Sequence, residues 1–218
     1  MNENPFDQQP FVTHYAEGPP RMVPGFAGLQ RMTWLLLKER APAQANILVL
    51  GAGGGLELKF LAEAEPDWKF EGIDPSQPML DLAAQTLGPL AERVTLTPGR
   101  VESAAPGPFH GATCLLTFHF IPLEERRHTL QQLRRRLLTG APLVVAHLSV
   151  PEPNRQQWIS RYLAFSGAPD SHETRTRLET QLTILTPDQD EALLREAGFL
   201  DVHLFYTGFT FRGWVASA

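Results

Sequence analysis

Residues 46–55, NILVLGAGGG, join a short apolar run to a glycine-rich turn, and apolar residues at helical spacing follow at 56–65. An apolar run this short, bounded by glycines, predicts a buried strand. Glycines 51, 53 and 55 suit a sharp turn where a ligand approaches the backbone without a Cβ in the way. The next helix would offer free N–H groups and a positive dipole end to a carboxylate or phosphate. The stretch therefore predicts a strand–turn–helix unit with a ligand site at its turn.

The same alternation of strands and helices continues along the chain. Further strands are predicted at 68–73, 93–97, 112–118 and 142–148, and helices at 25–40, 79–87 and 123–138. Such alternation implies a parallel sheet that is covered on both faces. Residues 201–206 and 209–215 predict a hairpin joined by Thr207-Gly208. The fold class is therefore α/β with a terminal antiparallel hairpin.

Two segments depart from this alternation. Residues 1–24 contain five prolines among polar residues, which predicts an extended arm with turns. Residues 151–186 predict two helices, and a short helix capped by Thr186 follows. We expect an N-terminal arm and cap helix at 1–44 and one domain at 45–218, with a helical insertion at about 151–186.

Composition limits the class of protein. The 218 residues carry a net charge of −5, so nucleic-acid binding would need a local basic patch. Cys114 has no partner for an internal disulfide and lies in an apolar run, as a small buried residue would. No apolar stretch is long enough to cross a bilayer and no metal-ligand spacing occurs, and from the polar N-terminal residues we expect no signal peptide. The sequence favours a cytoplasmic protein with neither a membrane nor a metal, and it leaves a homodimer open.

Asp74 ends the predicted strand at 68–73 and lies 23 residues after Gly51. An acidic side chain at this place can accept hydrogen bonds from both hydroxyls of a ribose. The alternative is that Asp74 caps the helix that follows Pro75-Ser76. The dinucleotide pattern G-x-G-x-x-G is excluded, because its third glycine would fall on Leu56. We interpret the loop and Asp74 together as a nucleoside site.

At these residues the sequence resembles the class I S-adenosylmethionine-dependent methyltransferases, over about residues 45–217. The resemblance implies a Rossmann-like, seven-stranded, mostly parallel sheet with helices on both faces and S-adenosyl-L-methionine as cofactor. It implies these contacts: Gly51, Ala52, Gly53 and Gly55 under the methionine part, Asp74 at the ribose, Pro75 and Met79 beside the adenine, Arg100 and Val101 at the adenine edge, and Thr117 beside the methionine. The family usually has an acid two residues before the first glycine. This chain has Val49 there, and Glu57 is the candidate substitute.

A narrower resemblance links residues 21–32, 177–188 and 197–216 to the bacterial carboxy-S-adenosylmethionine synthases, which serve a tRNA wobble-uridine pathway. Phe26 falls where that family has a tyrosine, and Thr117 where it has an asparagine. Arg177 falls near the arginine that holds the extra carboxylate. Phe26 and Arg177 are therefore further candidate cofactor-binding residues. Because two of the three distinctive positions differ, we interpret this as kinship of fold with a different reaction.

The predicted function is methyl transfer to a small-molecule acceptor. His119, just past the fourth strand, is the candidate catalytic base, and the alternative is a buried histidine between two phenylalanines. Arginines 126, 127 and 134–136 predict a solvated helix face more readily than a nucleic-acid surface. Two alternatives stay open: the carboxylated-cofactor synthase reaction and a non-catalytic nucleoside-binding protein.

Overall fold

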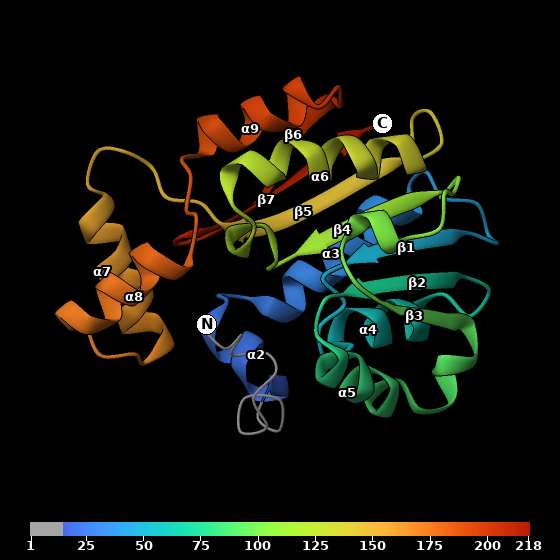
Figure 1. The fold of residues 1–218 in the computed structure, drawn as a ribbon, viewed down its shortest axis with the longest axis horizontal. Coiled ribbons are helices and arrows are strands. Elements are labelled where there is room, and N and C mark those ends of the chain that lie inside the picture. The colour runs from blue at the N-terminus through green and yellow to red at the C-terminus, as the bar shows by residue number, and fades with distance from the viewer. Residues whose placement is uncertain (1–14) are drawn as a thin grey trace.

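The computed structural model describes residues 15–218 and contains one seven-stranded sheet with the order β3-β2-β1-β4-β5-β7-β6 (Figure 1). The strands are β1 (Asn46–Leu50), β2 (Lys69–Asp74), β3 (Val94–Pro98), β4 (Gly111–Leu115), β5 (Pro142–Leu148), β6 (Leu200–Gly208) and β7 (Phe211–Ser217). The first five strands pair in parallel, and β7 pairs antiparallel with both β5 and β6. The predicted fold class and its terminal hairpin are confirmed, but the hairpin turns at Phe209-Thr210, because Thr207 and Gly208 still pair with β7 as the end of β6.

Helices cover both faces of the sheet. The main helices are α3 (Phe26–Lys38), α4 (Leu56–Ala64), α5 (Gln77–Leu87), α6 (Leu123–Arg136) and α9 (Pro187–Glu196). Short 3-10 helices lie between them: η3 (Gly88–Arg93), η4 (Val101–Ser103) and η5 (Phe118–Phe120). Residues of α3, α4 and α5 share one apolar cluster with one sheet face, and those of α6 and α9 share another with the opposite face. Alternate residues of each strand therefore supply two cores.

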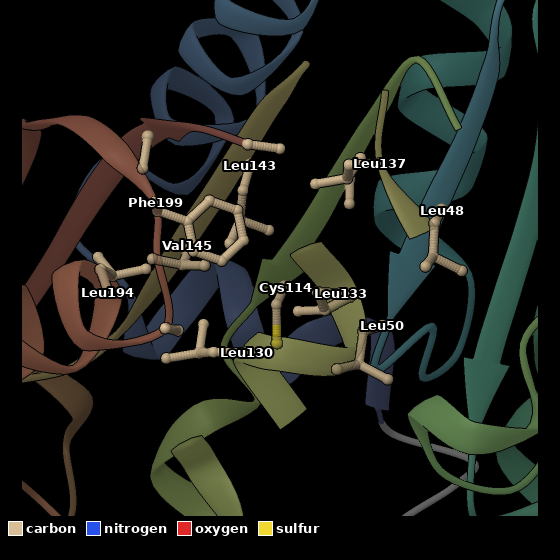
Figure 2. Packing of buried hydrophobic residues seen from close by; sticks show 14 of the residues in the cluster. Leu48, Leu50, Cys114, Leu130, Leu133, Leu137, Leu143, Val145, Leu194 and Phe199 are labelled. Carbon is tan, nitrogen blue, oxygen red and sulfur yellow. The ribbon is translucent and has the colours of Figure 1, made fainter. Parts of the chain in front are cut away.

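The core between the sheet and helices α6 and α9 is drawn in Figure 2. Cys114 of β4 lies beside Leu130 and Leu133 of α6, and Leu194 of α9 packs near Phe199. Cys114 is fully buried and is the free cysteine of the chain, as its apolar surroundings in the sequence predict. Burial raises the pKa of its thiol. Cys114 is therefore a packing residue.

The arm is helical where the structure describes it, so the prediction of an extended arm is wrong for residues 15–24. A 3-10 helix η2 (Tyr15–Glu17) leads into α2 (Gly18–Met22). Pro19 and Pro20 lie in the first turn of α2, where a backbone N–H has no intrahelical acceptor and proline costs little. His14 and the rest of 1–14 lie outside the described residues.

The two helices predicted after β5 are present as α7 (Arg155–Ser166) and α8 (His172–Gln181). They lie beyond the same end of the strands as α2 (Figure 1). Ser171 caps α8, and Thr186 begins α9 with a reciprocal capping box to Gln189. No helix within residues 15–218 is long and apolar enough to cross a membrane.

Two further expectations are corrected. The fourth strand ends at Leu115 instead of residue 118, because Leu116 has a φ of 57° and turns the chain into η5. Arg126 is buried instead of solvated, with its side chain 1% exposed. It donates to the carbonyl oxygens of Ile121 and Thr183 and pairs with Asp190, whose Oδ1 also lies 3.0 Å from His147 Nε2.

Candidate active site

A cavity of about 460 Å³ opens at the carboxyl ends of β1, β2 and β4, the edge where open α/β sheets hold their ligands. The arm, the glycine loop, η5 and the end of α8 all contribute to its wall. The lining residues are Tyr15, Pro19, Phe26, Gln30, Gly51, Ala52, Gly53, Leu56, Glu57, Asp74, Pro75, Met79, Leu115, Leu116, Thr117, Phe120, Thr180 and Gln181. Eight of the sequence candidates are thus brought together: Phe26, Gly51, Ala52, Gly53, Asp74, Pro75, Met79 and Thr117.

The glycine loop has two different structural requirements. Gly51 has a φ of 79°, and a Cβ there would lie 2.0 Å from Thr117 Oγ1, so the loop and the end of β4 meet across the cavity floor. Gly55 also has a positive φ, and its Cβ would lie 2.9 Å from the backbone of Ala83 in α5. Gly55 does not line the cavity. Its role is the close approach of α4 to α5, and the loop's contact with the cavity comes from residues 51–53.

Asp74 joins β2 to the glycine loop. Its Oδ2 accepts a hydrogen bond from Gly53 N–H at 2.9 Å, and its Oδ1 accepts one from Ser76 N–H at 3.0 Å. The N-cap of α5 is Ser76, whose hydroxyl accepts from Met79 N–H, so the capping alternative for Asp74 is not what the structure shows. The carboxylate is fixed by two backbone donors at the wall of the cavity, where it can still accept further hydrogen bonds.

Tyr15 of the arm packs on the glycine loop. A Cβ on Gly53 would lie 2.6 Å from the Tyr15 hydroxyl oxygen, and one on Gly54 would lie 2.5 Å from its ring. Burial raises the pKa of Tyr15 to about 12, and the nearby carboxylates of Asp74 and Glu57 act in the same direction. Tyr15 is therefore a hydrogen-bond donor at neutral pH. The sequence predicted an arm here but gave no sign that this tyrosine lies on the glycine loop.

Glu57 is the second residue of α4 and lines the cavity. Its Oε1 is buried and accepts no hydrogen bond from the residues that the structure describes. Burial raises the pKa of Glu57 to about 7, an effect that the hydroxyl of Thr113 partly offsets. A carboxyl group with this pKa is half ionised near neutral pH, and the lining residues within 15–218 offer it no Lys, Arg or His.

Several sequence candidates lie outside the cavity lining. Arg100 is exposed and pairs with Glu125 of α6, and Val101 is buried in the core beside α6. Arg177 is exposed on α8, one turn before Thr180. The lining residues Gln30, Thr180 and Gln181 were not anticipated, because a helix face toward a cavity has the same sequence pattern as one toward solvent.

His119 also lies outside the lining. Its ring is buried, and Nδ1 accepts a hydrogen bond from Leu148 N–H at 3.3 Å. Burial lowers the pKa of His119 well below its usual value, and the charges of His147 and Arg126 lower it further. Its position fits the alternative of a packed histidine, and the geometry offers no support for a base that reaches the cavity. Among residues 15–218 no group of three His, Cys, Asp or Glu side chains could hold a metal ion.

Comparisons with known proteins agree with this architecture. Residues 48–143 match the model of the family described as "Methyltransferase domain". The carboxy-S-adenosyl-L-methionine synthase of Chromohalobacter salexigens is 28% identical over 207 residues, which are 90% of this chain and 77% of that protein.

Solved structures share the fold at low sequence identity. A candidate O-methyltransferase of Nostoc punctiforme superposes with a TM-score of 0.72 at 16% identity, over 95% of this chain and 59% of that one. Human N-acetylserotonin methyltransferase in complex with S-adenosylmethionine gives 0.62 at 16% identity, over 96% and 59%. The chain thus spans about three fifths of these two proteins. Residues 48–143 thus match a methyltransferase domain, and the chain has the fold of the class I S-adenosylmethionine-dependent methyltransferases.

Proposed function

We propose that this chain binds S-adenosylmethionine in the cavity at the carboxyl ends of β1, β2 and β4 and transfers its methyl group to a small-molecule acceptor. The observation that carries the proposal is the convergence of the glycine loop and Asp74 on one cavity inside the methyltransferase domain. A nucleoside with an attached amino acid needs both a hydroxyl-binding acid and a backbone that it can approach closely.

The residues present fit this cofactor. Asp74 would accept hydrogen bonds from the ribose hydroxyls, and Pro75 and Met79 offer apolar surface for the adenine. The described lining contains two carboxyl groups, those of Glu57 and Asp74, and no Lys, Arg or His, which suits a ligand with positive charge. When bound, S-adenosylmethionine supplies a methyl group that its sulfonium already activates.

The rest of the wall favours a neutral acceptor. Phe26 and Phe120 provide aromatic surface, and Gln30, Thr180 and Gln181 provide uncharged hydrogen-bonding groups. Since the described lining has no cation for an anionic acceptor, we expect a small, partly apolar molecule with a nucleophilic oxygen, nitrogen or carbon. These side chains would hold the attacking atom in line with the methyl group and exclude water, and no strong general base is needed for that step.

Calorimetry and native mass spectrometry test the cofactor assignment. We expect the purified wild type to bind S-adenosylmethionine and S-adenosylhomocysteine, and Asp74→Ala to weaken both by about tenfold or more, since each hydrogen bond to a charged acceptor is worth about 1.5–3 kcal/mol. Asp81→Ala is the matched control, because Asp81 lies exposed on α5 and bonds only the side chain of Gln77 among the described residues. Unchanged affinity in Asp74→Ala would refute the ribose assignment.

The same experiment separates the two alternatives. A copurified nucleoside heavier by one carboxylate would favour the reaction after which the Chromohalobacter relative is named. That reading needs a cation near the extra carboxylate, and Arg177→Ala should then lose affinity for the carboxylated form. Binding without turnover of any acceptor would favour a non-catalytic protein. We favour the plain cofactor because Arg177 lies outside the cavity lining.

A further inference from the structure

Glu57 is a partly buried residue with one fully buried carboxyl oxygen, Oε1. It lies in the first turn of α4, directly after the glycine loop, and lines the cavity. Its Oε1 is inaccessible to solvent and accepts no hydrogen bond from the described residues. A buried carboxyl oxygen without a partner costs folding free energy, so this atom is expected to have a partner in the functional state.

The strand register shows which part of the sheet Glu57 covers. Val49 of β1 and Thr113 of β4 are neighbours in the parallel ladder, so their side chains lie on the same face. Leu58 and Leu61 of α4 pack in one apolar cluster with Val49, so α4 covers this face of the two strands. The Thr113 hydroxyl lowers the pKa of Glu57, which lies in the first turn of α4. The carboxyl therefore lies beside the carboxyl end of β1, next to residues 51–53 of the loop.

The charged surroundings of Glu57 identify the kind of partner it lacks. The titratable groups that interact with it are Tyr15 of the arm and Cys114 of β4, and Asp74 shares the cavity. None of these supplies a positive charge, and the described lining contains no Lys, Arg or His. Since residues 15–218 place no cation beside Glu57, we look to the ligand for the counter-ion, and an ammonium group is a cation that also donates hydrogen bonds to a carboxylate.

We propose that Glu57 binds the α-ammonium group of the cofactor's amino-acid part, from the first turn of α4 instead of from the end of β1. This assignment rests on the proposed function. The free N–H groups at the start of α4 suit the α-carboxylate of the same ligand, so the loop and Glu57 together match a zwitterion. Asp74 is left for the ribose.

The test compares two ligands that differ only in the amino group: S-adenosylhomocysteine and its deaminated analogue, which keeps the adenosine, the thioether and the carboxylate. We expect wild type to prefer S-adenosylhomocysteine by about tenfold or more, and Glu57→Gln to reduce this preference to within about threefold. Glu57→Asp keeps the charge but shortens the side chain by one methylene, so its preference for S-adenosylhomocysteine should lie between those of wild type and Glu57→Gln. Glu63→Gln is the control, because Glu63 lies exposed on the same helix and pairs with Lys59.

The preference ratio separates ligand recognition from damage to the fold, since a misfolded variant loses affinity for both ligands alike. An equal preference in wild type and Glu57→Gln would overturn the assignment of Glu57 and leave the proposed function standing. Failure of wild type to bind S-adenosylhomocysteine at all would overturn both. A thermal melt of each variant accompanies the titrations, and Glu57→Asp supplies the ratio if Glu57→Gln does not fold.

Discussion

The ligand-free protein should lose stability as the pH rises through 7, and Glu57→Gln should abolish that part of the loss. Glu57 has an ordinary pKa of 4.5 in the unfolded chain and a pKa of about 7 in the folded protein. Between these two values the folded protein binds more protons than the unfolded chain, so stability falls with increasing pH. The contribution is fully present below 4.5 and is lost above 7. Glutamine has nearly the same shape and does not titrate.

The size of the effect follows from the two pKa values. At about 1.4 kcal/mol for each pH unit, a rise from 4.5 to about 7 corresponds to about 3 kcal/mol as an upper limit. Because the cavity admits water beside the partly buried side chain, we expect a measured value of about 1–3 kcal/mol. In a chain of this length that is a change in Tm of about 2–12 °C.

Thermal melts at pH 5 and pH 8 without ligand measure this difference. The gap in Tm between Glu57→Gln and wild type should widen in favour of the variant from pH 5 to pH 8. The groups around Glu57, namely Tyr15, Asp74, Cys114 and Thr113, are present in both proteins, so their contributions cancel. Glu63→Gln should show no such widening. A gap of equal size at both pH values would refute a buried carboxyl group that is held without a counter-ion.

Two further predictions concern the frame of the site. Arg126→Met should destabilise the protein by about 3–5 kcal/mol in urea unfolding, because Asp190 is left as a buried charge, whereas Arg127→Met at an exposed pair should cost less than about 1 kcal/mol. Gly55→Ala should cost clearly more than Gly88→Ala. Both glycines have a positive φ, but only a Cβ on Gly55 would meet backbone atoms of another element. A Cβ on Gly88 would have nothing within 4 Å, so Gly88→Ala should lower the free energy of unfolding by only about 1 kcal/mol. Equal losses within either pair would contradict the packing described for α6 or for α4 and α5.

The sheet and the floor of the site could be predicted because they depend on local signals. Apolar runs bounded by glycines mark buried strands, and parallel pairing brings the carboxyl ends of those strands to one edge. Gly51 and Asp74 therefore meet at one cavity although they are far apart in the chain. The terminal hairpin and the burial of Cys114 follow from the same kind of pattern.

The misplaced residues depend on geometry that the sequence does not show. Leu116 adopts a positive φ without being glycine, and this turn leaves the ring of His119 bonded to the backbone of Leu148 and outside the cavity lining. Prolines in the arm predict extended chain in general, but two of them fit the first turn of α2. Arg126 and Arg127 are adjacent in a basic run, and only the tertiary contacts of α6 decide that one is buried and the other exposed.

The position of the carboxyl group shows why a motif position and a physical requirement are different things. Val49, read alone, suggests that this chain has lost an acid at the end of β1. In the fold, the side chains of Val49 and Thr113 lie on the face that α4 covers, and Glu57 extends from α4 into the same region. A ligand ammonium group requires a carboxylate at a given point in space, and a strand end and a helix start can both reach that point. If Glu57 binds the ammonium group as proposed, this chain carries the charge on α4 instead of at the end of β1, and the cost of holding it there without a ligand is the pH-dependent loss of stability predicted above.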